Sequence, residues 1–461
     1  MKYIVLGFEG FIFSVAHHLQ KEGCEVFSAQ VIDGAKTSVA SDFIEDEEEK
    51  KLRLSTYDNV IEKFSIDVLI KKLKKISDPK NYFVICESNN LFHYASYLQS
   101  LGFEGNFPTR ENRLFEVDRN LSKKFVKKYY PLLKVAENKS FHSVKSATTF
   151  LQKSKKVWVL KSQTDNLATL VPKTDSPSQA NTQLVEQLLV YKDVYESSGF
   201  LLEEKISSVI EITPEKIYYD GVPLGMTVMF ENKGIGSGNI SYQVGCAGDL
   251  VFPVNIESKI HDICFPPIVD KLAKRHKGLF IWDASLLIDS VSGDIYFGEF
   301  CPNRLGFNSF LTTLEQMPSI HSYFEHVVQK KNPFHLGTVG VSVTLFNLLR
   351  DPQTNRILKD TVIDFPEGNA KHIWPYEIYK KAIEGNYYAN GYDISISPIT
   401  ATGKTMSHAV ERLYTYVEKF QMNNVYYRPK FDFLSHDYPT SIPNRLAYCI
   451  DRKLFTLPFQ L

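Results

Sequence analysis

The first hundred residues alternate between short apolar runs and longer segments with helical spacing. The runs at residues 3–7, 24–28 and 82–86 are short and bounded by glycine or polar residues, which is typical of buried strands. Residues 11–22 and 91–101 have the length and spacing of amphipathic helices. Strands separated by helices of this length form βαβ units, so we expect a parallel sheet at the N-terminus.

Strand patterns dominate the middle of the chain. A basic amphipathic helix is predicted at residues 118–130, and the polar segment 162–178, which contains no aromatic residue, predicts a loop before a helix at 181–195. Strands are predicted at residues 157–161, 200–206, 210–219, 223–230 and 281–300.

The pattern changes again after Asn332-Pro333. Strands are predicted at residues 339–345 and 392–396, and a helix at 405–420. We therefore expect an α/β protein with three domains: an N-terminal α/β substrate domain (1–113), a central domain (114–332) with a lid subdomain at about 157–208, and a C-terminal domain (333–461).

Composition narrows the class of protein. Lysine plus arginine balances aspartate plus glutamate at 53 each, which favours neither nucleic acid nor an anionic membrane as a partner. The six cysteines are scattered without a C-x-x-C pair, which argues against a zinc site or a disulfide framework. No transmembrane segment is predicted, so we expect a cytoplasmic protein. We expect it to be a monomer or a homodimer.

Two acids near residue 290 are the strongest candidate for metal chemistry. Asp283 and Glu299 lie in apolar segments that flank a turn-like stretch, so a hairpin would place them opposite each other on adjacent strands. A hard cation such as Mg²⁺ would relieve their repulsion, and Asn303 and Arg304 add an oxygen ligand and a phosphate-binding fork. The alternative is that both acids simply lie on a solvated face.

Cationic candidates for phosphate binding are Lys161, at the end of an apolar strand, and Arg119 with Lys123, four residues apart on one helical face. A charge that closes a strand and a solvated basic face are the alternatives. In Leu202-Glu203-Glu204-Lys205-Ile206, an acid could accept from an adenine amino group while the backbone pairs with the ring edge. Alone, this segment is a weak motif.

In this order, the features resemble the ATP-grasp superfamily and, more closely, the phosphoribosylamine–glycine ligase family. The likeness covers nearly the whole chain. Glu299-Phe300-Cys301-Pro302-Asn303-Arg304-Leu305-Gly306 resembles the family's E-F-N-C-R-F-G metal-binding segment. Other similar segments are Met1–Gly10, Phe107–Arg110, Phe115–Arg119, Val159–Lys161, Leu202–Ile206, Ala401–Thr405 and Tyr426–Lys430.

The resemblance implies an ATP-grasp fold, with an N-terminal parallel-sheet domain and a small C-terminal α+β domain. It implies ATP and Mg²⁺ as cofactors, with Mn²⁺ as an alternative ion. Implied nucleotide contacts are Arg119, Lys161, Glu203, Glu204, Ile206 and, near the ribose, Glu211; implied metal ligands are Asp283, Glu299 and Asn303; Arg304 and Lys161 would be catalytic.

The implied reaction is the ATP-dependent joining of a carboxylate to an amine through an acyl phosphate. Glycine and a phosphoribosylamine are the implied substrates, as in purine biosynthesis. A different amino acid or amine, in a modification or salvage pathway, is one alternative. A degenerate module that binds nucleotide without turnover is another.

The chain also departs from the family pattern. The loop 162–170 has no glycine where the family has a glycine-rich lid. In Gly7–Phe13, Phe11 and Phe13 replace the arginine and the histidine of the family's G-x-G-G-R-E-H segment. The latter change predicts an altered pocket for the phosphoribosyl amine. The metal-binding segment has one extra residue, and we favour Asn303 over Cys301 as the ligand because a soft thiol binds Mg²⁺ poorly.

Overall fold

The structure is a computed structural model of the 461-residue chain. It describes every residue except 9, 32–45, 163–168, 208, 304, 306, 336, 383–384 and 461, together with the side chains of 239–242. The predicted catalytic residue Arg304 and most of the glycine-free loop therefore lie outside the described residues.

The N-terminal region forms a five-stranded parallel sheet in the order β3-β2-β1-β4-β5, which confirms the predicted βαβ pattern. Its central strands β1 (Lys2–Gly7) and β4 (Tyr82–Cys86) are almost entirely buried, as expected for strands covered on both faces. The remaining elements are α1 (Gly10–Lys21), β2 (Val26–Gln30), α2 (Glu47–Ser55), β3 (Lys63–Ser65), α3 (Ile66–Leu73), α4 (Phe92–Ser100) and β5 (Glu104–Gly105).

A large antiparallel sheet forms the centre of the molecule, in the order β13-β12-β9-β10-β11-β14-β18, with β20 paired to β14. Strands β14 and β18 come from the predicted C-terminal domain, so the central and C-terminal regions share one sheet and one hydrophobic core. The strands are β9 (Val209–Tyr219), β10 (Val222–Gly236), β11 (Ile240–Val254), β12 (Leu279–Asp289), β13 (Ile295–Phe300), β14 (Val339–Asn347), β18 (Ser395–Gly403) and β20 (Val425–Tyr426).

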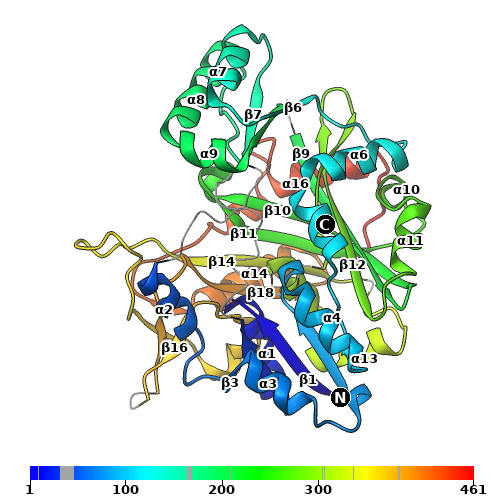
Figure 1. Cartoon of the computed structure of the whole chain (residues 1–461), viewed down its shortest axis with the longest axis vertical. Coiled ribbons are helices and arrows are strands. Elements are labelled where there is room, and N and C mark those ends of the chain that lie inside the picture. Colours follow the sequence, from blue (N-terminus) through cyan, green and yellow to red (C-terminus); the bar gives the residue numbers. More distant parts are fainter. Residues whose placement is uncertain are drawn as a thin grey trace.

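A smaller subdomain projects from one end of this body (Figure 1). Three antiparallel strands, in the order β6-β8-β7, pack with three helices around a separate hydrophobic core. This core includes Val144 and Ala147, so the subdomain begins well before residue 157, the predicted start of the lid. Its elements are β6 (Asn138–Phe141), α7 (Val144–Lys153), β7 (Trp158–Ser162), α8 (Pro177–Val190), α9 (Lys192–Ser198) and β8 (Phe200–Glu204).

Helices and a small second sheet complete the fold. The predicted strand at 392–396 is wrong in position, since β18 begins only at Ser395, whereas the predicted helix at 405–420 corresponds to α14 (Met406–Val417). The small sheet has the order β16-β17-β15-β19. Its strands are β15 (Val362–Asp364), β16 (Ile378–Lys380), β17 (Tyr387–Ala389) and β19 (Gln421–Met422), and the other helices are α5 (Arg110–Val117), α6 (Arg119–Tyr129), α10 (Lys259–Cys264), α11 (Pro267–Ala273), α12 (Asn308–Glu315), α13 (Ile320–Val328), α15 (Phe431–Leu434) and α16 (Ile442–Asp451).

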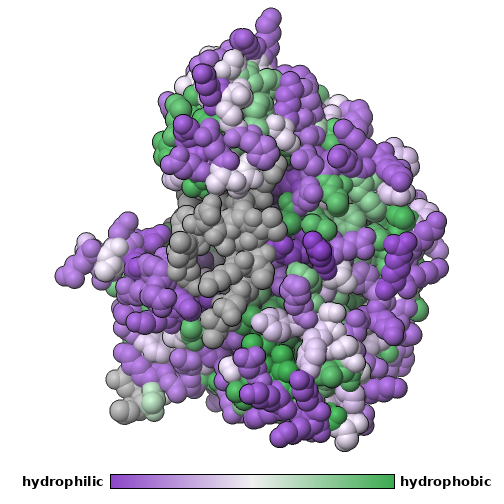
Figure 2. Space-filling view, in the orientation of Figure 1, coloured by the Kyte–Doolittle hydropathy of each residue, from purple (hydrophilic) through white to green (hydrophobic). Residues whose placement is uncertain are grey.

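Hydrophilic and hydrophobic residues both lie on the face shown in Figure 2, on the body and on the projecting subdomain alike. Within the part of the chain that the structure describes, no helix is both long enough and apolar enough to cross a bilayer. Each of the six cysteines is a free thiol, in agreement with the absence of a C-x-x-C pair from the sequence.

Candidate active site

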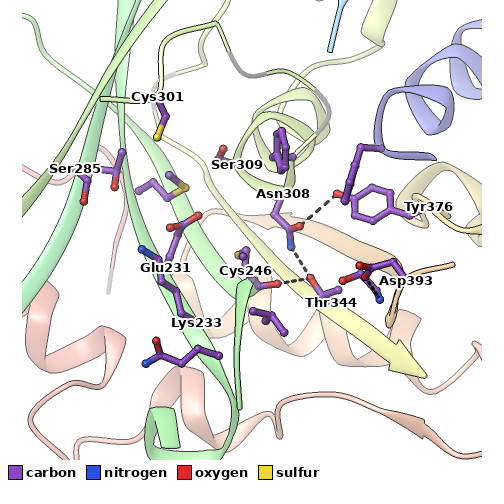
Figure 3. Close-up of a pocket in the computed structure, with 18 of the residues that line it drawn as sticks. Glu231, Lys233, Cys246, Ser285, Cys301, Asn308, Ser309, Thr344, Tyr376 and Asp393 are labelled. Atoms are coloured by element: carbon purple, nitrogen blue, oxygen red, sulfur yellow. Dashed lines mark hydrogen bonds between the residues drawn. The ribbon is translucent and has the colours of Figure 1, made fainter. Parts of the chain in front are cut away.

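A cavity of about 720 Å³ lies where the central sheet meets α1, the start of α12 and the C-terminal region (Figure 3). Strands β9, β10, β12 and β13 form one wall, and the opposite end is lined by residues of the three regions that meet there. The charged residues among the described lining are Glu211, Glu215, Glu231, Lys233, Asp283, Glu299, Arg350 and Asp393.

The charged wall has a simple origin in the strands. Side chains two residues apart in a strand lie on the same face, so a polar residue at every second position gives a polar face to an otherwise apolar strand. The lining residues follow this rule on each strand: Glu211, Thr213 and Glu215 on β9; Glu231 and Lys233 on β10; Asp283 and Ser285 on β12; Glu299 on β13, with Cys301 just beyond it.

The structure corrects the predicted pairing of Asp283 with Glu299. Glu299 lies opposite Ser285, because the register shifts between Ser285 and Leu286. The acid directly opposite Asp283 is Glu215, on the other neighbouring strand. Asp283 and Glu299 still line the same cavity, but they are diagonal rather than opposed.

Glu299 is surrounded by cations. Arg119 Nη1 lies 3.0 Å from Glu299 Oε2. Burial would raise the pKa of Glu299, but Arg119, Lys233 and Lys161 outweigh it and lower the pKa to about 2. This carboxylate is therefore ionised throughout the physiological range, as a metal ligand must be.

Glu211 and Lys233 form a second ion pair on the same wall, with Nζ 2.7 Å from Oε1. The hydroxyl of Ser285 also donates to Glu211, at 3.2 Å. Burial opposes ionisation of Glu211, but Lys233 outweighs it and lowers the pKa of this acid, while Glu211 raises the pKa of Lys233. Both groups are held in their charged forms at the cavity.

Glu215 is in a different environment. Burial raises its pKa to about 7, so the carboxyl group can gain or lose a proton near neutral pH. It lies between Asp283 on β12 and Thr227 on β10, and it lines the cavity. A group with this pKa in a cavity is a candidate general base.

Asn303 has a structural position that differs from the prediction. Its side chain is fully buried, its Oδ1 accepts from the Ile281 N–H at 2.8 Å, and its Nδ2 donates to Asn112 at 3.3 Å. The amide thus holds the start of β12 and is not part of the cavity lining, whereas Cys301 is. The N–H of Cys301 donates to Asp283 at 2.8 Å, which fixes this carboxylate from the adjacent strand.

Lys161 and Lys123 share one buried carboxylate. Lys161 Nζ lies 2.7 Å from Glu203 Oε1, and Lys123 pairs with the other oxygen of Glu203. Burial and the neighbouring cations lower the pKa of Lys123 to about 6 and that of Lys161 to about 8. This cluster joins α6 to the projecting subdomain, and the charges of Glu299 and Glu211 act on Lys161.

The predicted adenine segment, Leu202–Ile206, comprises the end of β8 and the two residues after it. Glu203 points to the two lysines, and Glu204, on the opposite face of the strand, pairs with Lys156 at 2.9 Å on the surface. Ile206 is half-buried after the end of the strand. The N–H groups of Glu204 and Lys205 bind Glu137 O and Val157 O, so these two donors already have backbone partners.

Among the described residues, no group of three or more His, Cys, Asp or Glu side chains has the arrangement of a metal site formed by protein alone. Two carboxylates with nucleotide phosphates are nevertheless a common way to hold Mg²⁺, which keeps several non-protein ligands.

Solved structures resemble this chain over almost its whole length. Phosphoribosylamine–glycine ligase from Thermotoga maritima has a TM-score of 0.62 at 17% identity, covering 93% of this chain and 99% of that chain. Biotin carboxylase from Campylobacter jejuni, in a β-γ-ATP complex, has a TM-score of 0.59 at 12% identity, covering 97% and 98%. The chain has the ATP-grasp fold.

A third structure with the ATP-grasp fold is the biotin carboxylase domain of the 2-oxoglutarate carboxylase from Hydrogenobacter thermophilus, in complex with MgADP, ADP and bicarbonate. Its TM-score is 0.57 at 12% identity, and the match covers 92% of this chain and 91% of that chain. No protein-family model and no curated protein matches the sequence. The comparisons therefore establish the ATP-grasp fold, and the chemistry has to be argued from the cavity.

Sequence reasoning missed several residues that line this cavity: Ser285, Glu215, Glu231, Lys233 and Cys246. The signal for Glu215 was present in the sequence. Glu211-x-Thr213-x-Glu215 places polar residues at alternate positions of a strand, whereas Glu231-Asn232-Lys233 is polar throughout and gives no alternation. Such alternation in a central strand indicates a face turned to a polar cavity.

Proposed function

We propose that this protein is an ATP-dependent carboxylate–amine ligase that forms an amide through an acyl phosphate. The observation that carries the proposal is the charged wall of the cavity. In an ATP-grasp fold, four adjacent strands turn Asp283, Glu299, Glu211 and Lys233 toward one space, with Arg119 beside Glu299. These side chains are only partly buried, so a ligand that enters the cavity can balance their charges.

Asp283 and Glu299 are the residues that would hold Mg²⁺. They fit a hard cation, because both offer carboxylate oxygens to the same cavity and the pKa of Glu299 is lowered to about 2. When bound with the nucleotide, the ion neutralises negative charge on the triphosphate. The similar biotin carboxylase structure with MgADP supports this choice of ion. Arg119, beside Glu299, is the proposed phosphate contact, and Lys161 would become a second one only by leaving Glu203, which its Nζ meets at 2.7 Å.

In the first chemical step, a carboxylate oxygen of the substrate attacks the γ-phosphorus of ATP, and the bond to the β–γ bridging oxygen breaks to release ADP. In the second step, the amine nitrogen attacks the acyl carbon and inorganic phosphate leaves. The nitrogen loses a proton, and Glu215 is the proposed acceptor because burial raises its pKa to about 7. Positioning and electrostatics supply most of the acceleration.

Glycine and a phosphoribosylamine remain one candidate pair of substrates, on the likeness to phosphoribosylamine–glycine ligase. A different amine is the second candidate. It is favoured by Phe11, which lines the cavity at the position where the family pattern has an arginine. A phenyl ring offers no hydrogen bond to a phosphate, whereas a guanidinium does.

The test is ADP release from purified full-length protein with Mg-ATP, mixtures of amino acids and mixtures of amines. The proposal expects release that requires both mixtures and is accompanied by a new amide in mass spectrometry. Glu299→Gln serves as the inactive variant, and Glu411→Gln, at a surface acid that pairs with Lys430 outside the cavity lining, serves as its matched control. If ATP binds but no mixture accelerates ADP release, the chain is a nucleotide-binding module and not a ligase.

A further inference from the structure

The end of the cavity away from the charged wall is aromatic. Phe11 of α1 stacks on Phe307, which precedes α12, with ring centroids 5.1 Å apart, and it meets Tyr376 edge-on at 4.4 Å. All three line the cavity. They come from the N-terminal, central and C-terminal regions respectively, so this aromatic cluster exists only because the three regions meet here.

Glycine at position 10 makes this meeting possible. A Cβ atom at Gly10 would lie 1.8 Å from the backbone oxygen of Tyr376, which no side chain could tolerate. The first turn of α1 therefore lies directly against the Tyr376 backbone, and Phe11, the next residue, is placed beside the Tyr376 ring. The close contact and the aromatic cluster are parts of the same local arrangement.

Three polar side chains beside the aromatic cluster, those of Tyr376, Asn308 and Thr344, already donate their hydrogen bonds to protein atoms. The Tyr376 hydroxyl donates to Asn308 Oδ1 at 3.3 Å, and Asn308 Nδ2 donates to Ser342 at 3.0 Å and to Thr344 at 2.8 Å. The Thr344 hydroxyl donates in turn to Cys246 O at 2.9 Å (Figure 3). A phosphate group needs several donors, and this chain of hydrogen bonds has none to spare.

The charges at this end also disfavour a phosphate. Asp393 lines this end of the cavity, and one oxygen of the Asp393 carboxylate accepts from the Ser395 N–H at 2.7 Å. The cation among the described lining residues here is Arg350, which is exposed at the rim, with Nη1 3.5 Å from Asn355 O. Across the cavity, Glu215 and Glu231 add negative charge, and the positive charge of Lys233 on the same wall is already paired with Glu211.

We propose that this end of the cavity binds an amine that has an apolar or aromatic body and no phosphate group. The inference rests on the proposed ligase function and names its amine substrate class. The ring faces of Phe11 and Phe307 take the apolar body, and they also attract a protonated amino group, as do the cavity carboxylates. A phosphorylated amine would instead meet aromatic rings, carboxylates and donors that are already engaged.

Isothermal titration of the full-length protein, saturated with Mg²⁺ and a non-hydrolysable ATP analogue, tests this directly. The probes are 2-phenylethylamine and 2-aminoethyl phosphate, two primary amines that differ in the group on the second carbon. We expect 2-phenylethylamine to bind at least tenfold more tightly. Tighter or equal binding of 2-aminoethyl phosphate overturns the proposal, and so does failure of both probes to bind.

Three variants sharpen the result. Phe11→Arg should weaken binding of 2-phenylethylamine at least tenfold and strengthen that of 2-aminoethyl phosphate. Phe431→Arg adds the same charge at a half-exposed aromatic residue outside the cavity lining, and it should change neither affinity. Phe11→Leu, which keeps an apolar side chain if the arginine variant fails to fold, should weaken only 2-phenylethylamine. A weakening by Phe431→Arg equal to that by Phe11→Arg would also overturn the proposal.

Binding and turnover separate the two hypotheses. A preference for 2-phenylethylamine without ADP release in any mixture of substrates would remove the ligase function and leave the ligand class intact. ADP release that depends on 2-aminoethyl phosphate, and not on 2-phenylethylamine, would support the ligase function and remove the ligand class.

Discussion

The charged wall of the cavity and the buried cluster at Glu203 differ in two respects: the sign of their excess charge and whether that charge faces an open space. On the wall, the acids Glu211, Glu215 and Glu299 outnumber Lys233 and face an open space. In the buried cluster, Lys123 and Lys161 outnumber Glu203 and are enclosed between α6 and the projecting subdomain.

A ligand site and a structural contact differ in how their excess charge is balanced. Excess charge next to a cavity can be balanced by a ligand that enters, whereas excess charge in the interior must be balanced by the protein itself. The pKa values reflect this: that of Lys123 is lowered to about 6, so the cluster can lose a proton, while that of Glu299 is lowered to about 2, so the wall keeps its charge. Four changes test the contrast.

The largest effect is expected from Glu203→Gln. The variant leaves two buried lysines without their carboxylate, so the free energy of unfolding should fall by about 3–5 kcal/mol. Urea denaturation and hydrogen exchange of residues 138–204 would measure it. A loss below about 1 kcal/mol would mean that Lys123 and Lys161 are not paired with Glu203 in solution.

Glu299→Gln should reduce ADP release by roughly 100-fold or more, because it removes an ionised group from the reacting phosphates while keeping the shape of the side chain. The Mg²⁺ concentration required for half-maximal release should rise in the residual activity. The melting temperature should fall only modestly, because Arg119 loses the partly exposed carboxylate with which it pairs at 3.0 Å. Full activity with Glu299→Gln would place the metal site elsewhere.

Glu215→Gln tests the proposed base. Since Glu215 must be ionised to accept a proton, ADP release should rise with pH through about 7, and the variant should lose this step together with roughly tenfold of the rate. The stability of the folded protein changes with pH in the opposite direction to ADP release. The folded protein binds more protons than the unfolded chain between pH 4.5, the ordinary pKa of a glutamate, and about pH 7, so stability falls as pH rises through this range.

Urea denaturation at pH 4.5 and pH 7 measures that slope, which Glu215→Gln should flatten. If the slope and the pH dependence of ADP release are both unchanged in the variant, Glu215 does not titrate in this range and is not the base.

The smallest effect is expected from Glu204→Gln. This acid is next to Glu203 but faces solvent, where its pair with Lys156 contributes less than about 1 kcal/mol to stability. Denaturation should differ little from the unchanged protein, and ADP release should be normal. A large loss of ATP binding would instead support the predicted contact between Glu204 and adenine.

The sequence predicted the central strands of the two large sheets and put Asp283 and Glu299 near each other, but it missed several helices, among them α2, α7, α12, α13 and α16. It missed β11, whose residues include Gly245 and Gly248 and therefore lack a strong strand pattern. The reason for Gly248 lies in distant parts of the chain: a Cβ atom there would lie 2.7 Å from Phe433 and 2.9 Å from Ser342 O. Such a constraint cannot be recognised before the strands are paired.

The sequence by itself determined which residues alternate along each strand, and hence which side chains share a face, because that spacing is a property of the extended backbone. Only the tertiary structure decided which strands are neighbours and in what register. It placed Glu215 rather than Glu299 opposite Asp283, turned Asn303 toward the backbone of β12, and brought Phe11, Phe307 and Tyr376 together from three regions. These contacts join residues far apart in the chain, and packing of the whole molecule fixes them.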